Sequence, residues 1–210
     1  EPLLKFAAAE WPPYTGANLK NGGVASQIVT AAFQRVGYRV EFVVLPWLRA
    51  QKLVREGQLN GMGIAWYTEK RAATMAYSAP YLRTEIVLIK HRDDNTIYRR
   101  RQDLENRHFA ILRGYGYLNL LPANAVRTTV LDNLEQSFRM LAKKRVNLTL
   151  EEKLNAWYRL SFMPSNVRDQ IAFAPKALEI KDLHMTISHH NPDYEEIIAA
   201  FNRGLQLIIN

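Results

Sequence analysis

The sequence predicts an α/β protein of two lobes, each built around a largely parallel sheet. Strand-like and helix-like segments alternate between residues 3 and 65, a polar segment interrupts the pattern at residues 91–107, and the alternation restarts at residue 108. Strands that are separated by helical stretches pair in parallel through right-handed crossovers, so each round of alternation predicts one sheet with its own helices. The chain has 210 residues, 48% of them hydrophobic, which is enough for one sizeable core or two small ones.

The first lobe is expected to contain three strands and two helices before the chain leaves it. Apolar residues recur every three or four positions in its helical segments and every second position in "YRVEFVVL", and Gly37 follows the first helix as a stop signal. The expected order is strand 3–9, helix 23–36, strand 38–45, helix 47–56 and strand 59–65.

The second lobe is expected to repeat this plan after a strand at residues 84–90. The expected order is strand 108–112, a glycine-led turn and short helix at 114–121, strand 126–130, helix 132–144, strand 146–150 and helix 151–160. The chain then returns through a strand that starts at residue 183, with the histidine pair 189–190 in a turn, to a last helix with Asn191 as its N-cap and Pro192 at the first helical position. We therefore expect lobe 1 to comprise residues 1–88 and 188–210, and lobe 2 residues 89–187.

Composition narrows the classes of function. The formal charge of +8 favours anionic partners, but the densest basic runs, residues 99–101 and 143–145, are short and no nucleic-acid motif accompanies them, so we expect no nucleic-acid binding. The absence of cysteine excludes disulfides, thiolate metal sites and a cysteine nucleophile, and the five histidines are scattered, so no metal or other cofactor is expected. No apolar run reaches the roughly 18 residues that span a bilayer, and the opening "EPLLKFAAAEW" is not a signal peptide, so a soluble mature chain is expected.

The ends of the predicted strands are the places to look for a binding site. In open parallel sheets ligands bind beyond the carboxyl ends of the strands, and two lobes that face each other would hold a ligand in the cleft between them and close by a hinge. The residues at these ends are Trp11, Trp47, residues 63–67, Arg71, residues 113–116, Glu151 and Glu152.

Four stretches together resemble one known family. They are "EWPPYTG", "GGVASQIVTAAFQRVGYRVEFVVLPWLRAQKLVREGQLNGM", "TEKRAATMAYSAPYL" and "RMLAKKRVNLTLEEKLNAWYRL", which are similar to the type 3 periplasmic solute-binding proteins of bacterial ABC transporters, the amino-acid binders among them. The resemblance implies the two-lobe type II periplasmic binding protein fold. It also implies a monomeric binding protein without catalytic activity, located in the periplasm after removal of a signal peptide. Such a protein captures a small carboxylate or amino acid by hinge closure and delivers it to an ABC permease in the inner membrane.

The resemblance also implies a set of ligand-binding residues. In the family, one arginine holds the ligand's carboxylate; it comes shortly after a threonine and just before a turn similar to "SAPY". Arg71 has this position, because it follows Thr68 and precedes "SAPY". The aromatic pair that packs on the ligand maps onto Trp11 and Trp47, which suits an apolar or flat ligand or a stacked cation. Further expected contacts are Tyr14, Trp66, Arg113, Tyr115 and Gly116, together with Glu152 as the acid that pairs with an ammonium group, Glu151 being one residue earlier.

Some positions depart from the family pattern. The segment "GIAW" replaces the serine or threonine that usually precedes the arginine, Tyr115 and Gly116 replace common hydroxyl donors, and Asn60 and Asn147 replace frequent aspartates. We interpret these changes as a loss of polar ligand contacts around a retained carboxylate site, with Trp66 narrowing the pocket. The identity of the ligand therefore stays open.

Two alternatives share the same fold. One is an enzyme similar to cyclohexadienyl or arogenate dehydratases, in which an arginine clamp and a nearby carboxylate would act as substrate anchor and general acid or base. The other is the ligand-sensing domain of a membrane receptor.

Overall fold

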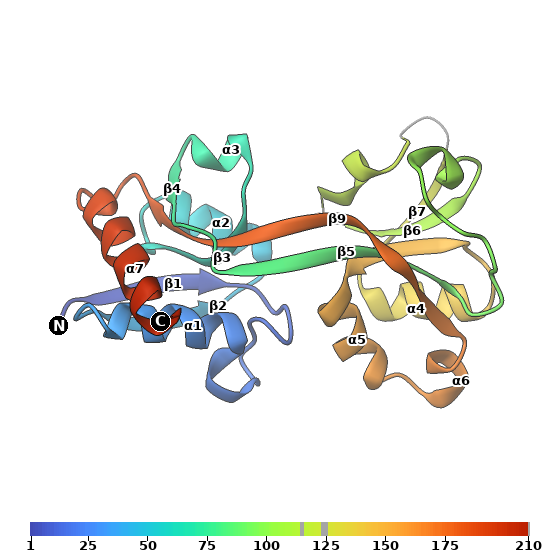
Figure 1. Ribbon diagram of the computed structural model, residues 1–210, viewed down its shortest axis with the longest axis horizontal. Coiled ribbons are helices and arrows are strands. Elements are labelled where there is room, and N and C mark those ends of the chain that lie inside the picture. The colour runs from blue at the N-terminus through green and yellow to red at the C-terminus, as the bar shows by residue number, and fades with distance from the viewer. Residues whose placement is uncertain (114–115, 123–125, 210) are drawn as a thin grey trace. The chain divides into compact units, whose positions relative to one another are not determined.

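The computed structural model describes residues 1–113, 116–122 and 126–209 and divides the chain into two compact units. Unit 1 comprises Glu1–Arg83 and Lys181–Asn210, and unit 2 comprises Thr84–Ile180. The element order is shown in Figure 1. Each unit is a mixed α/β body with its own core, as the repeated alternation of the sequence predicts.

Two long strands carry the chain from one unit to the other. The chain leaves unit 1 along β5 (Leu82–His91) and returns along β9 (Ile171–Ser188), and both unit boundaries fall inside these strands (Figure 1). The boundaries expected after residues 88 and 187 lie further along the same two strands, and the polar segment 91–107 lies within unit 2. Only the last part of β9 was expected to be a strand.

The sheet of unit 1 confirms the predicted β-α-β-α-β order. Strand β1 pairs in parallel with β2 and with β3, with Phe6 opposite both Phe42 and Gly61. The second half of β9 pairs with β3 in antiparallel direction, and β4 pairs with β9 in the same way. The elements of this unit are β1 (Leu3–Ala8), η1 (Lys20–Gly22), α1 (Val24–Gln34), β2 (Arg39–Val44), α2 (Trp47–Arg55), β3 (Gly61–Trp66), α3 (Glu69–Ala72), β4 (Met75–Tyr77) and α7 (Tyr194–Ile209).

Helix α7 begins later than the sequence predicts. Asn191 is not its N-cap: the Asn191 side-chain oxygen accepts a hydrogen bond from the backbone N–H of Asp193 at 3.0 Å, and the helix begins at Tyr194. Asparagine favours such a local turn because its side chain can bond the backbone two residues on, and this turn competes with an immediate helix start.

The core of unit 1 joins its sheet to α1 and α7. The rings of Phe6 and Phe33 lie 5.6 Å apart between centroids, those of Phe33 and Phe201 lie 5.2 Å apart, and all three side chains are fully buried. Gly204 of α7 lies against α1, where a Cβ atom would come within 2.0 Å of the Ala32 carbonyl oxygen. The two helices can therefore pack this closely only because residue 204 has no side chain.

We predict that Gly204→Ala lowers the free energy of unfolding by about 2 kcal/mol, because the added methyl group forces α1 and α7 apart. Urea denaturation followed by circular dichroism measures this change. Gln206→Ala, at an exposed position of the same helix, is the matched control and should change stability by less than about 0.5 kcal/mol. Equal stability of the two variants would contradict the close helix packing.

Unit 2 repeats the plan around β8. Strand β8 pairs in parallel with β6, which pairs in parallel with β7, and β8 pairs with β5 in antiparallel direction, with Glu152 opposite Ile86. Its core includes Phe138 and Leu141 of α4, packed with Ala110 of β6. The remaining elements and their bounds are η2 (Arg101–Leu104), β6 (His108–Leu112), η3 (Gly116–Leu120), β7 (Arg127–Leu131), α4 (Leu134–Ala142), β8 (Leu148–Glu152), α5 (Lys153–Ser161) and α6 (Ser165–Arg168).

Two expectations for unit 2 change in detail. The helix expected from residue 151 begins at Lys153, because Glu151 and Glu152 still belong to β8. Helix α6 was not expected, since it is four residues long and too short to show a helical period. Among the helices of the described ranges, none is long and apolar enough to cross a membrane.

Candidate functional site

Arg71 lies where a parallel strand of unit 1 ends. Strand β3 ends at Trp66, and α3 begins three residues later with Thr68 as its N-cap. The Thr68 hydroxyl oxygen accepts a hydrogen bond from the backbone N–H of Arg71 at 3.2 Å, which fixes the turn that presents the arginine. The "SAPY" turn is tied to the same strand, because the Tyr81 hydroxyl donates to the Gly63 carbonyl oxygen at 2.7 Å.

The guanidinium group of Arg71 is held by described residues through its Nη1 atom and one ring contact. Its Nη1 donates to the Trp66 carbonyl oxygen and lies 3.4 Å from the Tyr77 hydroxyl oxygen. Its Cζ lies 5.2 Å from the ring centroid of Trp47, which orients the plane of the group. The Nε atom is buried and has no hydrogen-bond partner within the described part of the chain. A buried donor without a partner is costly, so an acceptor at this position would be strongly favoured.

Two further predicted residues, Trp11 and Tyr14, pack beside Trp66. The ring of Trp11 stacks on that of Tyr14 with centroids 4.7 Å apart and meets the ring of Trp66 edge-on at 5.5 Å. Trp11 Nε1 is a second buried donor that finds no partner among the residues described. Tyr14 is only 3% exposed and packs into the core next to Ile64 and Leu183. The structure thus brings Trp11, Tyr14, Trp47, Trp66 and Arg71 into one cluster of unit 1, which we call the arginine cluster.

The sequence did not identify two members of the arginine cluster. The Tyr77 hydroxyl donates to the Trp66 carbonyl oxygen at 3.1 Å, and the Nζ atom of Lys181 lies 5.0 Å from the ring centroid of Trp66. Tyr77 lies six residues after Arg71, but its strand β4 is only three residues long and carries little pattern. Lys181 comes from β9, so only the pairing of β9 with β3 places it here.

The acidic pair of unit 2 lies at the end of β8. Glu151 and Glu152 are both 1% exposed. An oxygen of Glu152 accepts a hydrogen bond from the backbone N–H of Asn155 at 2.8 Å, so this carboxylate caps α5. An oxygen of Glu151 accepts one from the Tyr117 hydroxyl and one from the Glu152 N–H, each at 2.7 Å. Burial raises the pKa of Glu151 to about 7.

The loop after β6 is described in part. Arg113 is exposed, and its Nε donates to the Asp132 carboxylate at 3.1 Å. Gly116 opens η3, whereas the predicted contact Tyr115 lies outside the described residues. The binding roles expected for Arg113, Tyr115 and Gly116 stay predictions.

Asn60 and Asn147 have a structural role instead of marking lost ligand contacts. The Asn60 side-chain oxygen accepts a hydrogen bond from the backbone N–H of Lys5 at 2.7 Å, and that of Asn147 accepts one from His108 at 2.8 Å. Each asparagine directly precedes a strand and holds the neighbouring parallel strand in register. Both therefore lie at the opposite strand ends from Arg71 and Glu152, which corrects our interpretation of these two positions.

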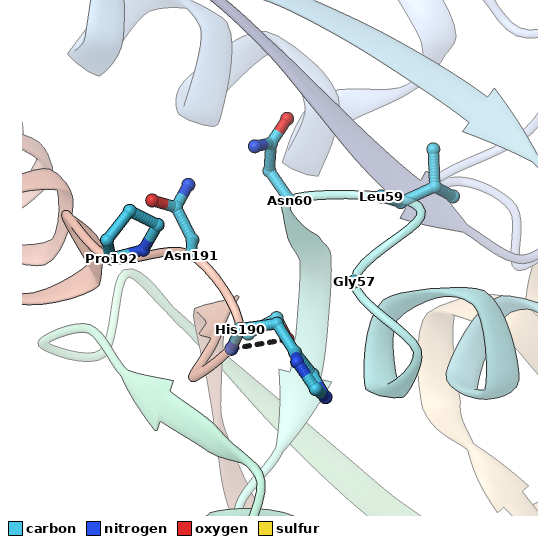
Figure 2. A pocket seen from close by; sticks show the side chains of 7 residues that line it. Gly57, Leu59, Asn60, His190, Asn191 and Pro192 are labelled. Carbon is cyan, nitrogen blue, oxygen red and sulfur yellow. Dashed lines mark hydrogen bonds between the residues drawn. The ribbon is translucent and has the colours of Figure 1, made fainter.

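A polar pocket of about 250 Å³ lies at the start of β3, away from Arg71. Figure 2 shows the side chains that line this pocket. The side-chain oxygens of two of them, Asn60 and Asn191, already accept hydrogen bonds from backbone N–H groups. The lining residues are Gly57, Leu59, Asn60, Ser188, His190, Asn191 and Pro192.

Within the described ranges, no group of three or more His, Asp or Glu residues is placed so that it could hold a metal ion.

Solved structures with the same fold span nearly the whole chain. A double mutant of the VFT2 domain of BvgS from Bordetella pertussis is 19% identical, with a TM-score of 0.77 over 99% of this chain and 88% of that chain. Holo ArgBP from T. maritima is 15% identical, with a TM-score of 0.76 and coverages of 100% and 90%. An ancestral arginine-binding protein bound to glutamine is 18% identical, with a TM-score of 0.75 and coverages of 99% and 92%. At such identities the likeness defines the fold alone, a mixed α/β fold like that of periplasmic binding proteins, and confirms the predicted fold class.

The sequence itself places the chain in a family. The model of the bacterial extracellular solute-binding proteins, family 3, matches residues 4–210, and the chain belongs to this family. This confirms the resemblance. A search of curated protein sequences finds no match.

Proposed function

We propose that the protein binds a small solute through a carboxylate group and that Arg71 is the residue that pairs with it. The observation that carries this proposal is the buried Nε of Arg71, which lacks a partner in the described residues while Nη1 is held by Trp66. A planar guanidinium offers parallel N–H donors that match the two oxygens of a carboxylate. Because the aromatic rings and Tyr77 fix its orientation in advance, little conformational entropy is lost on binding.

Glu152 of unit 2 is the proposed partner of an ammonium group, if the solute is an amino acid. Its carboxylate is buried and already caps α5, so its position is fixed. Burial of a zwitterion is tolerable only when both charges are paired, and the proposal assigns one protein charge to each. Family membership and the amino-acid binders among the proteins of similar fold support this assignment.

A thermal-shift screen followed by calorimetry tests the binding proposal. The panel contains amino acids and small carboxylates, each beside its neutral primary amide. We expect at least one carboxylate to stabilise the protein in a saturable way, by roughly 2.7 kcal/mol at about 100 times its dissociation constant. Its amide should give no shift at the same concentration. Equal stabilisation by acid and amide would contradict a carboxylate site.

The proposal includes hinge closure and delivery of the solute to an ABC permease. Closure predicts that a saturating ligand reduces the radius of gyration in small-angle X-ray scattering. Delivery predicts that the protein, when added with its ligand, stimulates the permease's ATP hydrolysis.

A sensory role stays the alternative, since proteins with this fold include a histidine kinase sensor domain at a TM-score of 0.77 and 17% identity. A membrane span and kinase domain in the full gene product would favour that role.

We further propose that the solute is released unchanged. A dehydratase needs an acid or base that can reach the substrate. Glu151 has a pKa of about 7, which suits such a role, but its side chain is 1% exposed and one of its oxygens already accepts two hydrogen bonds. It is therefore poorly placed to exchange a proton with a substrate. Proton NMR of a bound carboxylate, incubated with catalytic amounts of protein, should show no new species. Turnover of a cyclic carboxylate would contradict the proposal.

A further inference from the structure

The polar pocket at the start of β3 presents two amide donors. The side-chain oxygen of each lining asparagine, Asn60 and Asn191, already accepts a backbone N–H, at 2.7 and 3.0 Å respectively. An amide whose oxygen is engaged turns its NH2 group the other way, and in Figure 2 the two amide nitrogen atoms point toward each other. Neither NH2 group donates a hydrogen bond to any residue in the described ranges. The two groups are therefore available to an acceptor in the pocket.

A third donor, the Ser188 hydroxyl group, lines the same pocket. Ser188 is 0% exposed, and its Oγ accepts a hydrogen bond from the backbone N–H of His190 at 3.2 Å. The hydroxyl proton itself has no acceptor among the residues that the structure describes. A buried donor without an acceptor costs free energy, so an oxygen atom placed in the pocket would satisfy Ser188 as well as the amides.

The size and charge of the pocket limit the kind of molecule that fits. Its volume is about 250 Å³, and its lining contains no Lys, Arg, Asp or Glu. Pockets for drug-sized ligands have volumes of roughly 300–1,000 Å³, so the occupant is smaller than such ligands. An ion held among these neutral groups would lose hydration without gaining a partner of opposite charge. The pocket therefore suits a small neutral molecule that supplies acceptor oxygens.

We infer that this pocket is a second binding site and that it takes a small polyol, such as a triol, a tetritol or a single sugar. A polyol carries an oxygen on nearly every carbon, so one molecule can accept hydrogen bonds from several donors in a small volume. Each hydroxyl group also brings a proton, and Ser188 Oγ has a second lone pair that can accept one. The pocket lies at the opposite end of β3 from Arg71, so polyol binding here is independent of the proposed carboxylate site.

NMR titration of the side-chain NH2 signals of Asn60 and Asn191 tests this site. Each pair of signals is identified by its absence from the spectrum of Asn60→Asp or Asn191→Asp, where a carboxylate oxygen can still accept the backbone N–H. The probes are glycerol, erythritol, ribose and glucose, with acetate and methylammonium at equal ionic strength as charged comparisons. We expect at least one polyol to shift both pairs in a saturable way, with a dissociation constant in the millimolar range or below, and the two ions to shift neither.

Asn191→Ala and a matched control show whether binding belongs to this pocket. Asn191→Ala removes one of the donors and should weaken the best polyol at least about tenfold. Asn133→Ala removes an asparagine with a similar local role in unit 2, since its side-chain oxygen accepts the backbone N–H of Gln136 at 2.9 Å. This control should leave the affinity for the polyol within about twofold of the wild type. Circular dichroism of each variant shows that a loss of affinity is not a loss of fold.

Three results would overturn the polyol site. The first is that no polyol moves both pairs of side-chain signals. The second is that acetate or methylammonium saturates these signals at a lower concentration than every polyol does. The third is that a folded Asn133→Ala variant loses as much affinity as Asn191→Ala. None of these results bears on the carboxylate site, which is tested with other ligands and with Arg71→Gln.

Discussion

Arg71→Gln is expected to weaken binding of the solute at least about 100-fold, which corresponds to roughly 2.8 kcal/mol. The glutamine side chain cannot offer the parallel charged donors of a guanidinium, so the carboxylate is left desolvated and without its charge partner. Calorimetric titration of the best ligand from the screen, at constant ionic strength, measures the loss. Arg71→Lys keeps the charge but not the planar fork, and we expect an intermediate loss.

Two controls make the Arg71 result specific. Lys70→Gln removes a neighbouring exposed charge on α3 and should leave the affinity within about threefold of the wild type. Because Arg71 also bonds the Trp66 carbonyl oxygen, the melting temperature of each variant must be compared with that of the wild type. Unchanged affinity in a folded Arg71→Gln variant would refute the assignment of the carboxylate site.

Glu151→Gln is expected to stabilise the protein at pH 8 by about 3 kcal/mol and to have little effect near pH 4.5. Burial raises the pKa of this carboxyl from 4.5 to about 7, so the folded protein binds its proton more tightly than the unfolded chain does. Stability from this group is therefore present below about pH 4.5, is lost as the pH rises towards 7, and stays lost above it. Glutamine keeps an oxygen for the Tyr117 hydroxyl and the Glu152 N–H but carries no charge.

Urea unfolding at several values between pH 4.5 and pH 8 measures the effect of Glu151→Gln. Glu105→Gln replaces an exposed carboxylate of the same unit and should change stability by less than about 0.5 kcal/mol at each pH. The decisive quantity is the difference in unfolding free energy between Glu151→Gln and the wild type as a function of pH. A difference that does not change with pH would contradict the raised pKa of Glu151.

The parts of the fold that sequence could predict are those set by local pattern. The alternation of apolar residues gave the parallel strands of both units, and Gly37 marked the end of α1. Strand β9 was predicted only in part, because Pro175 and charged residues interrupt the apolar alternation of its first half. The start of α7 was misplaced because Asn191 can cap a helix or close a turn, and only the structure distinguishes the two.

The arginine cluster, too, could be predicted from the sequence only in part. The position of Arg71 after β3 followed from the strand pattern and from the resemblance. Tyr77 and Lys181 could not be found in this way. The place of Tyr77 depends on the pairing of β4 with β9, and Lys181 lies on β9 itself, which pairs with β3 from a distant part of the sequence. Asn60 and Asn147 were interpreted as altered ligand contacts, whereas each bonds the backbone of a neighbouring strand. Residue type alone does not show at which end of a strand a side chain acts.

The most direct test of the carboxylate site is the NMR signal of the Arg71 Nε–H during titration with the tightest carboxylate of the screen. The signal is identified by its absence from the spectrum of Arg71→Lys. We predict a downfield shift and slower exchange with water as the site saturates, because the buried Nε then donates a charge-assisted hydrogen bond. An unmoved Nε–H signal in a protein that calorimetry shows to be saturated would contradict the proposal that Arg71 holds the carboxylate.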